Sequence, residues 1–329
     1  MTRRLTSHDV AREAGVSVSA VSRAFTPGAS VSPDKKARIL RAATELGYRP
    51  NVMARAVATK RSNVVGLILY NETNRHYPEV LLALSSAFSA FGVRVMLFLL
   101  EKEDEIDATI EHILSYQLDG VITAALIPSK SLELLRSARV PLLFYNRPGM
   151  EGCASVSCDH MTSGSAIARH VIGLGRRNIA LLRAYRDSSV GCERMMGVEQ
   201  EIVNAGAHIV AEFRGQFDYK SGVAAALLWT AKDAPPFDAI IAANDMMAIG
   251  AKDALVYHVG RSVPDDVVVA GFDGTEASQW IGNAIPSVAQ PIEQMSRAAA
   301  SMMVDRIADP ACLPERRLFP GRLALPDLT

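Results

Sequence analysis

With 329 residues, 49% of them hydrophobic, the chain is long enough for two or three domains with sizeable cores. No run of 18 apolar residues occurs, which excludes a membrane-spanning helix, and the arginines near the N-terminus are not followed by the apolar stretch of a secretory signal. The formal net charge is zero, but residues 1–61 carry twelve Lys or Arg against four Asp or Glu. A basic head on an acidic body is typical of a protein that binds nucleic acid, although a merely solvated basic surface would give the same count.

The cysteines and histidines give no sign of a disulfide framework or a metal site. The four cysteines, Cys153, Cys158, Cys192 and Cys312, form no CxxC pair, and the seven histidines show no HExxH spacing. We therefore expect a reduced, cytoplasmic protein with no structural metal and no cofactor.

Residues 1–49 are predicted to form a small domain of three short helices with a thin core. Thr6, followed three residues later by an aspartate, has the spacing of a capping box for a helix over 7–13. Ser17 can cap a second helix over about 18–25.

The third helix is followed by a basic linker. Ser32 and Pro33 give an N-cap and a first helical position, and Gly47 ends the helix. Residues 50–62 can form two helical turns, which are marginal alone in water, so this linker is expected to fold only when a partner holds it.

Residues 63–329 are predicted to form an α/β body of two lobes. Apolar strand-like runs alternate with helical stretches, and they fall at 64–70, 93–100, 120–126, 141–146, 178–184, 208–213, 238–244 and 267–273. Continuous apolar strands between helices indicate parallel sheets that are covered on both faces. Ligands of such sheets bind beyond the carboxyl ends of the strands, which places a site in the cleft between the lobes.

Several motifs together resemble one known family. In HDVAREAGVSVSAVSRAF, Ala11, Gly15 and Val21 fall where a helix-turn-helix needs a small residue, a turn glycine and a buried β-branched residue. With VSPDKKARILRAATELGYRPN, AANDMMAIGA and VVVAGFDGTE in the same order, the whole chain is similar to the lactose-repressor (LacI/GalR) family of bacterial transcription regulators. The resemblance implies a helix-turn-helix headpiece on a periplasmic-binding-protein-like body. It also implies a homodimeric repressor that binds double-stranded operator DNA and is not an enzyme.

The resemblance also assigns DNA contacts. Base reading falls on Val18 and Ser19, which can meet a thymine methyl and a base edge, and on Arg23, which can grip guanine. The other candidates are Thr6, Ser17, Ser22 and Asn51, of which Ser17, Ser22 and Asn51 are expected to position the protein on phosphates. A helical hairpin with small residues for tight packing is the alternative interpretation of this stretch.

In the linker, Val57 stands where the family inserts a leucine into the minor groove. Apolar wedges of this kind unstack a base step and kink the duplex, but Val is shorter and a poorer helix former than Leu. A plain flexible linker is the alternative.

The effector site implied by the resemblance comprises His76, Tyr77, Asn146, Asp159, Arg194, Phe217, Asn244, Asp273 and Gln290. Aromatic rings with converging polar side chains suit a polyol, so a sugar or sugar derivative is favoured. Asn244 and Asp273 could instead be helix caps, because each directly precedes or opens a helix. The apolar segment PEVLLALSSAF is expected to lie at the dimer interface.

Two other classes share the predicted body. A periplasmic-type solute-binding protein without DNA function has the same two lobes, and an enzyme could use the same cleft. The basic head argues against the former. No GxSxG elbow, Walker loop or metal-ligand spacing supports the latter, and GLGRR at 173–177 follows a helix instead of a strand, as a helix end does.

Overall fold

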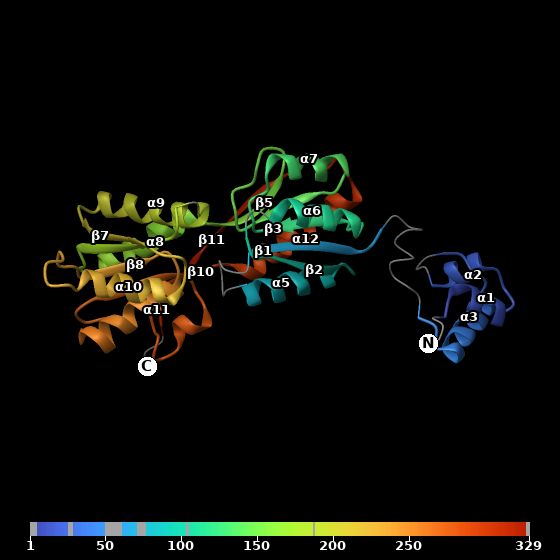
Figure 1. Ribbon diagram of the computed structural model, residues 1–329, viewed down its shortest axis with the longest axis horizontal. Coiled ribbons are helices and arrows are strands. Elements are labelled where there is room, and N and C mark those ends of the chain that lie inside the picture. Colours follow the sequence, from blue (N-terminus) through green and yellow to red (C-terminus); the bar gives the residue numbers. More distant parts are fainter. Residues whose placement is uncertain are drawn as a thin grey trace. The chain divides into compact units, whose positions relative to one another are not determined.

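The computed structural model (Figure 1) describes residues 5–25, 29–49, 61–70, 77–102, 105–186 and 188–326. The chain divides into two compact units, one made of residues 1–63 with 116–119 and the other of 64–115 with 120–329. The predicted linker at 50–62 lies almost wholly outside the described residues.

The N-terminal unit contains α1 (Ser7–Glu13), α2 (Val18–Ala24) and α3 (Pro33–Leu46). The capping predictions for α1 and α2 are confirmed: Thr6 and Asp9 form a capping box, and Ser17 Oγ accepts a hydrogen bond from Ala20 N at 3.2 Å. Ser32 occupies the N-cap of α3, but its side chain makes no capping hydrogen bond. The helix ends, as predicted, at Gly47, whose φ of 68° is the left-handed conformation that glycine adopts without strain.

The first lobe of the body is a parallel sheet with the order β11-β5-β4-β3-β1-β2. Its strands are β1 (Val64–Tyr70), β2 (Arg94–Leu100), β3 (Gly120–Thr123), β4 (Leu142–Tyr145), β5 (Ala154–Asp159) and β11 (Arg316–Pro320). Its helices are α5 (Tyr77–Ser89), α6 (Ile106–Ser115), α7 (Ser129–Ser137) and α12 (Ile292–Ala308).

The second lobe repeats this plan with the order β12-β10-β9-β8-β6-β7, in which only β12 runs antiparallel to its neighbour. Its strands are β6 (Asn178–Arg183), β7 (His208–Arg214), β8 (Ala239–Ala242), β9 (Val268–Asp273), β10 (Ser287–Ala289) and β12 (Arg322–Ala324). Its helices are α8 (His160–Gly173), α9 (Ser189–Asn204), α10 (Tyr219–Trp229), α11 (Asp245–Asp253), the π-helical turn η2 (Ala254–Val259) and the 3-10 turn η3 (Glu276–Gln279).

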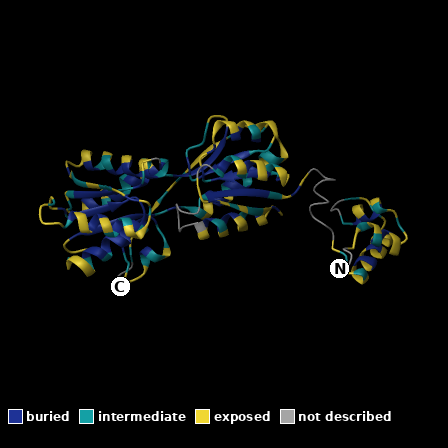
Figure 2. Cartoon of the chain, viewed as in Figure 1, coloured by how far each residue is buried: buried dark blue, intermediate teal, exposed yellow. Residues whose placement is uncertain are grey.

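Each lobe has its own buried core, and the central strands are its most buried part (Figure 2). The predicted covering of the sheets on both faces does not extend fully to β2, where Leu97 and Leu99 are exposed at the edge of the first sheet. Among the described residues, no helix is long and apolar enough to cross a membrane.

Three segments connect the lobes. The chain leaves the first lobe between β5 and α8, returns between β10 and α12, and passes once more between β11 and β12 through Gly321. A Cβ at Gly321 would lie 2.5 Å from Ser163 Oγ and 2.6 Å from Val288 Cγ1, so this third segment fits only without a side chain. The lobes therefore share one continuous body with a cleft between them.

Candidate effector cleft and nucleic-acid interface

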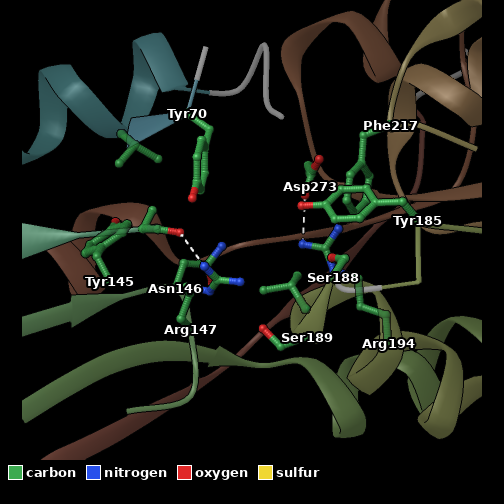
Figure 3. Close-up of a pocket in the computed structure, with 13 residues that line it drawn as sticks. Tyr70, Tyr145, Asn146, Arg147, Tyr185, Ser188, Ser189, Arg194, Phe217 and Asp273 are labelled. Atoms are coloured by element: carbon green, nitrogen blue, oxygen red, sulfur yellow. Dashed lines mark hydrogen bonds and ion pairs between the residues drawn. The ribbon is translucent and has the colours of Figure 1, made fainter. Parts of the chain in front are cut away.

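A cleft lies between the two lobes, beyond the carboxyl ends of several parallel strands (Figure 3). The first lobe contributes Tyr70, Val80, Ala124, Tyr145, Asn146 and Arg147, and the second contributes Tyr185, Ser188, Ser189, Val190, Arg194, Phe217 and Asp273. Tyr70 and Tyr145 are the last residues of β1 and β4, and Asp273 is the last residue of β9. The sheet topology thus brings side chains from distant parts of the sequence around one cavity.

Arg194 and Asp273 form a buried ion pair in the wall of the second lobe. Arg194 Nη2 lies 2.8 Å from Asp273 Oδ1, and the two side chains are 2% and 3% exposed. Arg194 Nη1 also donates to the carbonyl oxygen of Ala243 at 2.7 Å, and its guanidinium lies over the Phe272 ring at 5.1 Å. Gln290 Nε2 donates to Asp273 Oδ1 at 2.8 Å. Both charges are therefore fixed in place by partners of the same lobe.

His160 links this ion pair to the first lobe. Its Nδ1 lies 3.3 Å from Arg194 Nε, which can only donate, so Nδ1 accepts and Nε2 carries the proton that bonds Asn146 Oδ1 at 3.0 Å. Burial, and then the charge of Arg194, lower the pKa of His160 well below 6.5. The neutral ring therefore joins Asn146, which follows β4 in one lobe, to Arg194 on α9 in the other.

Three residues of the cleft have a left-handed backbone, which is uncommon outside glycine. Asn146, Phe217 and Asp273 have φ angles of 53°, 58° and 110°. Asn244 Nδ2 donates to the carbonyl oxygen of Phe217 at 2.9 Å and so holds this strained turn. Because such strain clusters where side chains must be aimed at a ligand, it supports this cleft as the functional site.

Behind the cleft, Asp245 is fully buried at the start of α11. Its carboxylate accepts hydrogen bonds from Thr275 N at 2.8 Å, from Thr275 Oγ1 at 2.9 Å and from Ser287 Oγ at 2.6 Å. Burial and the nearby charge of Asp273 outweigh these bonds and raise the pKa of Asp245 to about 7. Near neutral pH a proton on Asp245 therefore relieves repulsion from Asp273.

In the N-terminal unit, α2 presents a polar face. Its core side is made by Ala20, Val21 and Ala24. On the other side Ser19, Ser22 and Arg23 are exposed, as are Thr6 and Ser17, whereas Val18 is half-buried and packs against the core. A short helix with small exposed side chains and one arginine has the dimensions of a recognition helix for the major groove.

Comparison with known proteins decides the family. Residues 6–51 match the model of bacterial regulatory proteins of the lacI family, and residues 168–325 match a periplasmic binding protein-like domain. The HTH-type transcriptional regulator CelR of Thermobifida fusca is 32% identical over 98% of this chain and 97% of its own length. The chain belongs to the LacI family.

Other relatives agree with this assignment. The ribose operon repressor of Halalkalibacterium halodurans is 28% identical over 98% of this chain and 97% of its own. A solved complex of the regulator CelR with cellobiose has a TM-score of 0.72 at 30% identity, covering 98% of this chain and 99% of its own. The lac repressor dimer bound to operator has the same fold, with a TM-score of 0.87 at 24% identity and 98% of each chain covered.

This LacI-family chain is therefore a DNA-binding transcription regulator and not an enzyme, and the predicted fold class is confirmed. The alternative of a solute-binding protein without DNA function is wrong, because residues 6–51 match the family's DNA-binding region.

Of the nine predicted effector residues of this LacI-family chain, four line the cleft: Asn146, Arg194, Phe217 and Asp273. Gln290 and Asn244 lie behind the cleft and hold Asp273 and Phe217, and Asn244 is also the N-cap of α11, accepting a hydrogen bond from Met247 N.

Asp159 lies at the lobe crossover, where it caps α8 by accepting hydrogen bonds from Thr162 N and Oγ1 at 3.0 and 2.7 Å. It does not line the cleft. Tyr77 is the first residue of α5, and only its backbone is described; His76, like Asn51 and Val57 of the DNA set, lies outside the described residues.

Sequence reasoning missed several cleft residues of the LacI-family body: Tyr70, Tyr145, Arg147, Tyr185, Ser188 and Ser189. Tyr70 and Tyr145 could have been found, because Tyr70 ends the strand predicted over 64–70 and Tyr145 is the penultimate residue of the strand predicted over 141–146. Tyr185 carried no comparable signal, yet its ring packs edge-on against Phe217 with centroids 5.7 Å apart. The aromatic platform in the described cleft is therefore Tyr185 with Phe217, where the sequence had suggested Tyr77 with Phe217.

Proposed function

We propose that this regulator is a cytoplasmic repressor that binds a near-palindromic operator as a homodimer, with its operator affinity set by a sugar or sugar derivative in the cleft. The observation that carries the proposal is the chain of contacts from Asn146 through His160 and Arg194 to Asp273, because it joins both lobes at one cavity. A ligand that contacts both walls acts on the relative position of the lobes.

The chemistry of the walls supports a sugar. Arg194 and Asp273 offer a forked donor and an acceptor, which suit neighbouring hydroxyls, and Tyr185 with Phe217 offers ring faces for the apolar side of a sugar. Relatives named for ribose and crystallised with cellobiose point in the same direction.

The coupling to DNA follows from chain connectivity. The linker at 50–62 leads into β1, so a change in the first lobe reaches the C-terminal end of each linker in a dimer. Ligand-driven movement of the lobes then changes the separation of the two linkers and hence of the two recognition helices. This coupling must be reciprocal, so operator DNA changes effector affinity by the same factor.

We assign the dimer interface to the first lobe. Exposed apolar side chains occur on α5, at Leu82, in the turn after it, at Phe91, and on β2, at Leu99, and these residues are 71%, 51% and 53% exposed. Exposed apolar side chains in this part of a regulator that reads a two-fold operator are suited to contact with a second copy of the chain.

The DNA assignment is tested with an operator selected from random duplex DNA by the full chain. We expect a near-palindrome, and we expect Arg23→Ala to cost about 1–3 kcal/mol and to relax one position of each half-site. Lys36→Ala is the matched control, because Lys36 is an exposed cation on α3 and is expected to weaken binding to all sequences alike. Uniform loss in both variants would contradict the base-reading role of α2.

The effector assignment is tested by fluorescence anisotropy of the labelled operator during titration with sugars and sugar derivatives. A compound that shifts operator affinity by several-fold in the parent chain and leaves it unchanged in Asp273→Asn supports the cleft as the control site. Arg169→Met, on the surface of α8, is the control that should respond as the parent does. Failure of every such compound to alter operator affinity would contradict the proposal.

A further inference from the structure

We infer that the effector carries an anionic group, a carboxylate or a phosphate, which is bound by Arg147 and Ser189 on opposite sides of the cleft. This inference rests on the proposed function and narrows its ligand from sugars in general to sugar acids or sugar phosphates.

The first observation is the buried charge of Arg147. This residue follows Asn146 after β4, lines the cleft and is only 9% exposed. Its Nη1 donates to the carbonyl oxygen of Ala124 at 3.2 Å, and no carboxylate of the described chain pairs with it. Burying a guanidinium without a counter-charge is costly, so the site is incomplete until an anion enters.

Comparison with Arg194 shows that a buried arginine without a carboxylate partner is not a general property of the cleft. Arg194 is buried even more deeply, but Asp273 neutralises it. Among the described residues that line the cleft, two cations therefore face a single carboxylate, which is already engaged. The remaining positive charge belongs to the first lobe.

The second observation is an unsatisfied hydroxyl on the other wall. Ser189 Oγ is shielded from solvent and has no hydrogen-bond partner in the described structure. Figure 3 shows Arg147 and Ser189 entering the space between the lobes from different elements. A hydroxyl donor and a guanidinium that face the same space are complementary to an oxyanion.

The third observation is the position of α9. This helix of sixteen residues begins at Ser189, and its N-cap Ser188, which accepts a hydrogen bond from Gly191 N at 3.0 Å, lines the cleft together with Ser189 and Val190. The partial positive charge at a helix N-terminus favours an anion. It adds to the charge of Arg147, which a neutral sugar would leave without an anionic partner among the described residues.

These contacts also orient the ligand. The anionic group lies between Arg147 and Ser189, and the hydroxyl-bearing part lies toward Arg194, Asp273 and the Tyr185–Phe217 rings. Neither end alone uses the whole cleft, so both the charge and the polyol are required.

The test is isothermal titration calorimetry of the full chain with matched pairs of ligands. D-glucuronate and D-gluconate are compared with D-glucose, D-galacturonate is compared with D-galactose, and D-glucose 6-phosphate separates phosphate from carboxylate. We expect at least one charged compound to bind at least tenfold more tightly than its neutral counterpart. The inference is overturned if every charged compound binds no better than its neutral counterpart, which includes the case in which none binds.

Two variants connect the charge preference to the named residues. Arg147→Met keeps the length and apolar contacts of the side chain and is expected to weaken the charged ligand by about 10- to 100-fold while changing a neutral sugar less than about threefold. Ser189→Ala is expected to weaken the charged ligand by about tenfold. Arg169→Met removes a surface arginine, and its affinity should match that of the parent.

Equal loss of charged and neutral ligands in Arg147→Met would overturn the inference, because it would indicate a role in folding or shape. The two proposals fail separately. A neutral sugar that binds tightly and shifts operator affinity would overturn this inference and leave the proposed repressor function standing. A charged sugar that binds the cleft through Arg147 without any effect on operator affinity would overturn the proposed control of operator binding and leave the anion-binding role of Arg147 standing.

Discussion

The two lobes have the same architecture, but the charged side chains that they present to the cleft have different partners. Their sheets have corresponding strand orders, so the carboxyl ends of equivalent strands reach the same edge in each. In the second lobe the charges at that edge are paired within the lobe, as in Arg194 with Asp273. In the first lobe, Arg147 has only a backbone carbonyl as its partner within the part of the chain that the structure describes. The sheet topology thus brings polar side chains to the cleft from both lobes. The wall of the second lobe is preorganised by its own ion pair, whereas the wall of the first lobe depends on the ligand for a counter-charge to Arg147.

The largest effect is expected from breaking the paired wall. Asp273→Ala leaves the guanidinium of Arg194 buried without a carboxylate and removes the acceptor for Gln290. We expect the free energy of unfolding of the body to fall by about 3–5 kcal/mol, measured by urea denaturation. A loss below about 1 kcal/mol would mean that Arg194 is not held by this pair.

Protonation of Asp245 is expected to give the next largest effect. Its pKa is raised from 3.8 to about 7, so between these values the folded chain holds a proton that the unfolded chain lacks. Its stabilising contribution is therefore present at low pH and is lost as pH rises through about 7. Asp245→Asn, which keeps an acceptor for Thr275 and a donor for Ser287, should remove the part of the stability loss that the parent chain shows as pH rises from 3.8 to about 7. An unchanged profile would contradict this assignment.

His160 titrates in the opposite sense. Its pKa in the folded chain lies well below 6.5, so its contribution is present above pH 6.5 and is lost as pH falls below that value. In His160→Gln we expect a smaller loss of melting temperature between pH 7 and 5 than in the parent chain. Since the exchange also alters the link between Asn146 and Arg194, effector affinity should fall even at pH 7. A parent-like slope and affinity would show that the ring does not couple the lobes.

The smallest effect on stability is expected at the unpaired wall. Arg147→Met breaks one hydrogen bond to a carbonyl and no ion pair within the described chain, so the free energy of unfolding without ligand should change by less than about 1 kcal/mol. Thermal denaturation of Arg147→Met and Asp273→Ala under the same conditions measures the difference in stability between the two variants. Equal destabilisation by Arg147→Met and Asp273→Ala would contradict the proposed difference between the two walls of the cleft.

Much of this arrangement was accessible from the sequence, because it depends on local patterns. Capping residues such as Thr6 and Ser17, and apolar runs such as 64–70 and 178–184, specify elements through short-range spacing. The strand-end rule and the family resemblance together reached Asn146, Arg194, Phe217 and Asp273.

The missed features depend on long-range packing. Strands β10 and β12 are three residues long, and β11 carries two arginines, so none has an apolar run. Arg147 is distinctive because no carboxylate of the described chain pairs with it, and Ser189 because its Oγ is shielded from solvent without a hydrogen-bond partner in the described structure. Both properties depend on how the lobes pack and cannot be predicted from local sequence. Asp159 has the same residue type and setting as a ligand-binding carboxylate, and only the contacts with Thr162 identify it as a helix cap.

The crossover at Gly321 has a consequence for how strongly the regulator can respond. Every movement of one lobe against the other must pass through three connecting segments, and one of them is packed so tightly beside Ser163 and Val288 that no side chain fits. We therefore expect this position, which does not line the effector cleft, to affect the range of the switch, meaning the ratio of operator affinities with and without effector. Substitution of Gly321 is expected to change this ratio while the recognised operator sequence and the recognised effector stay the same.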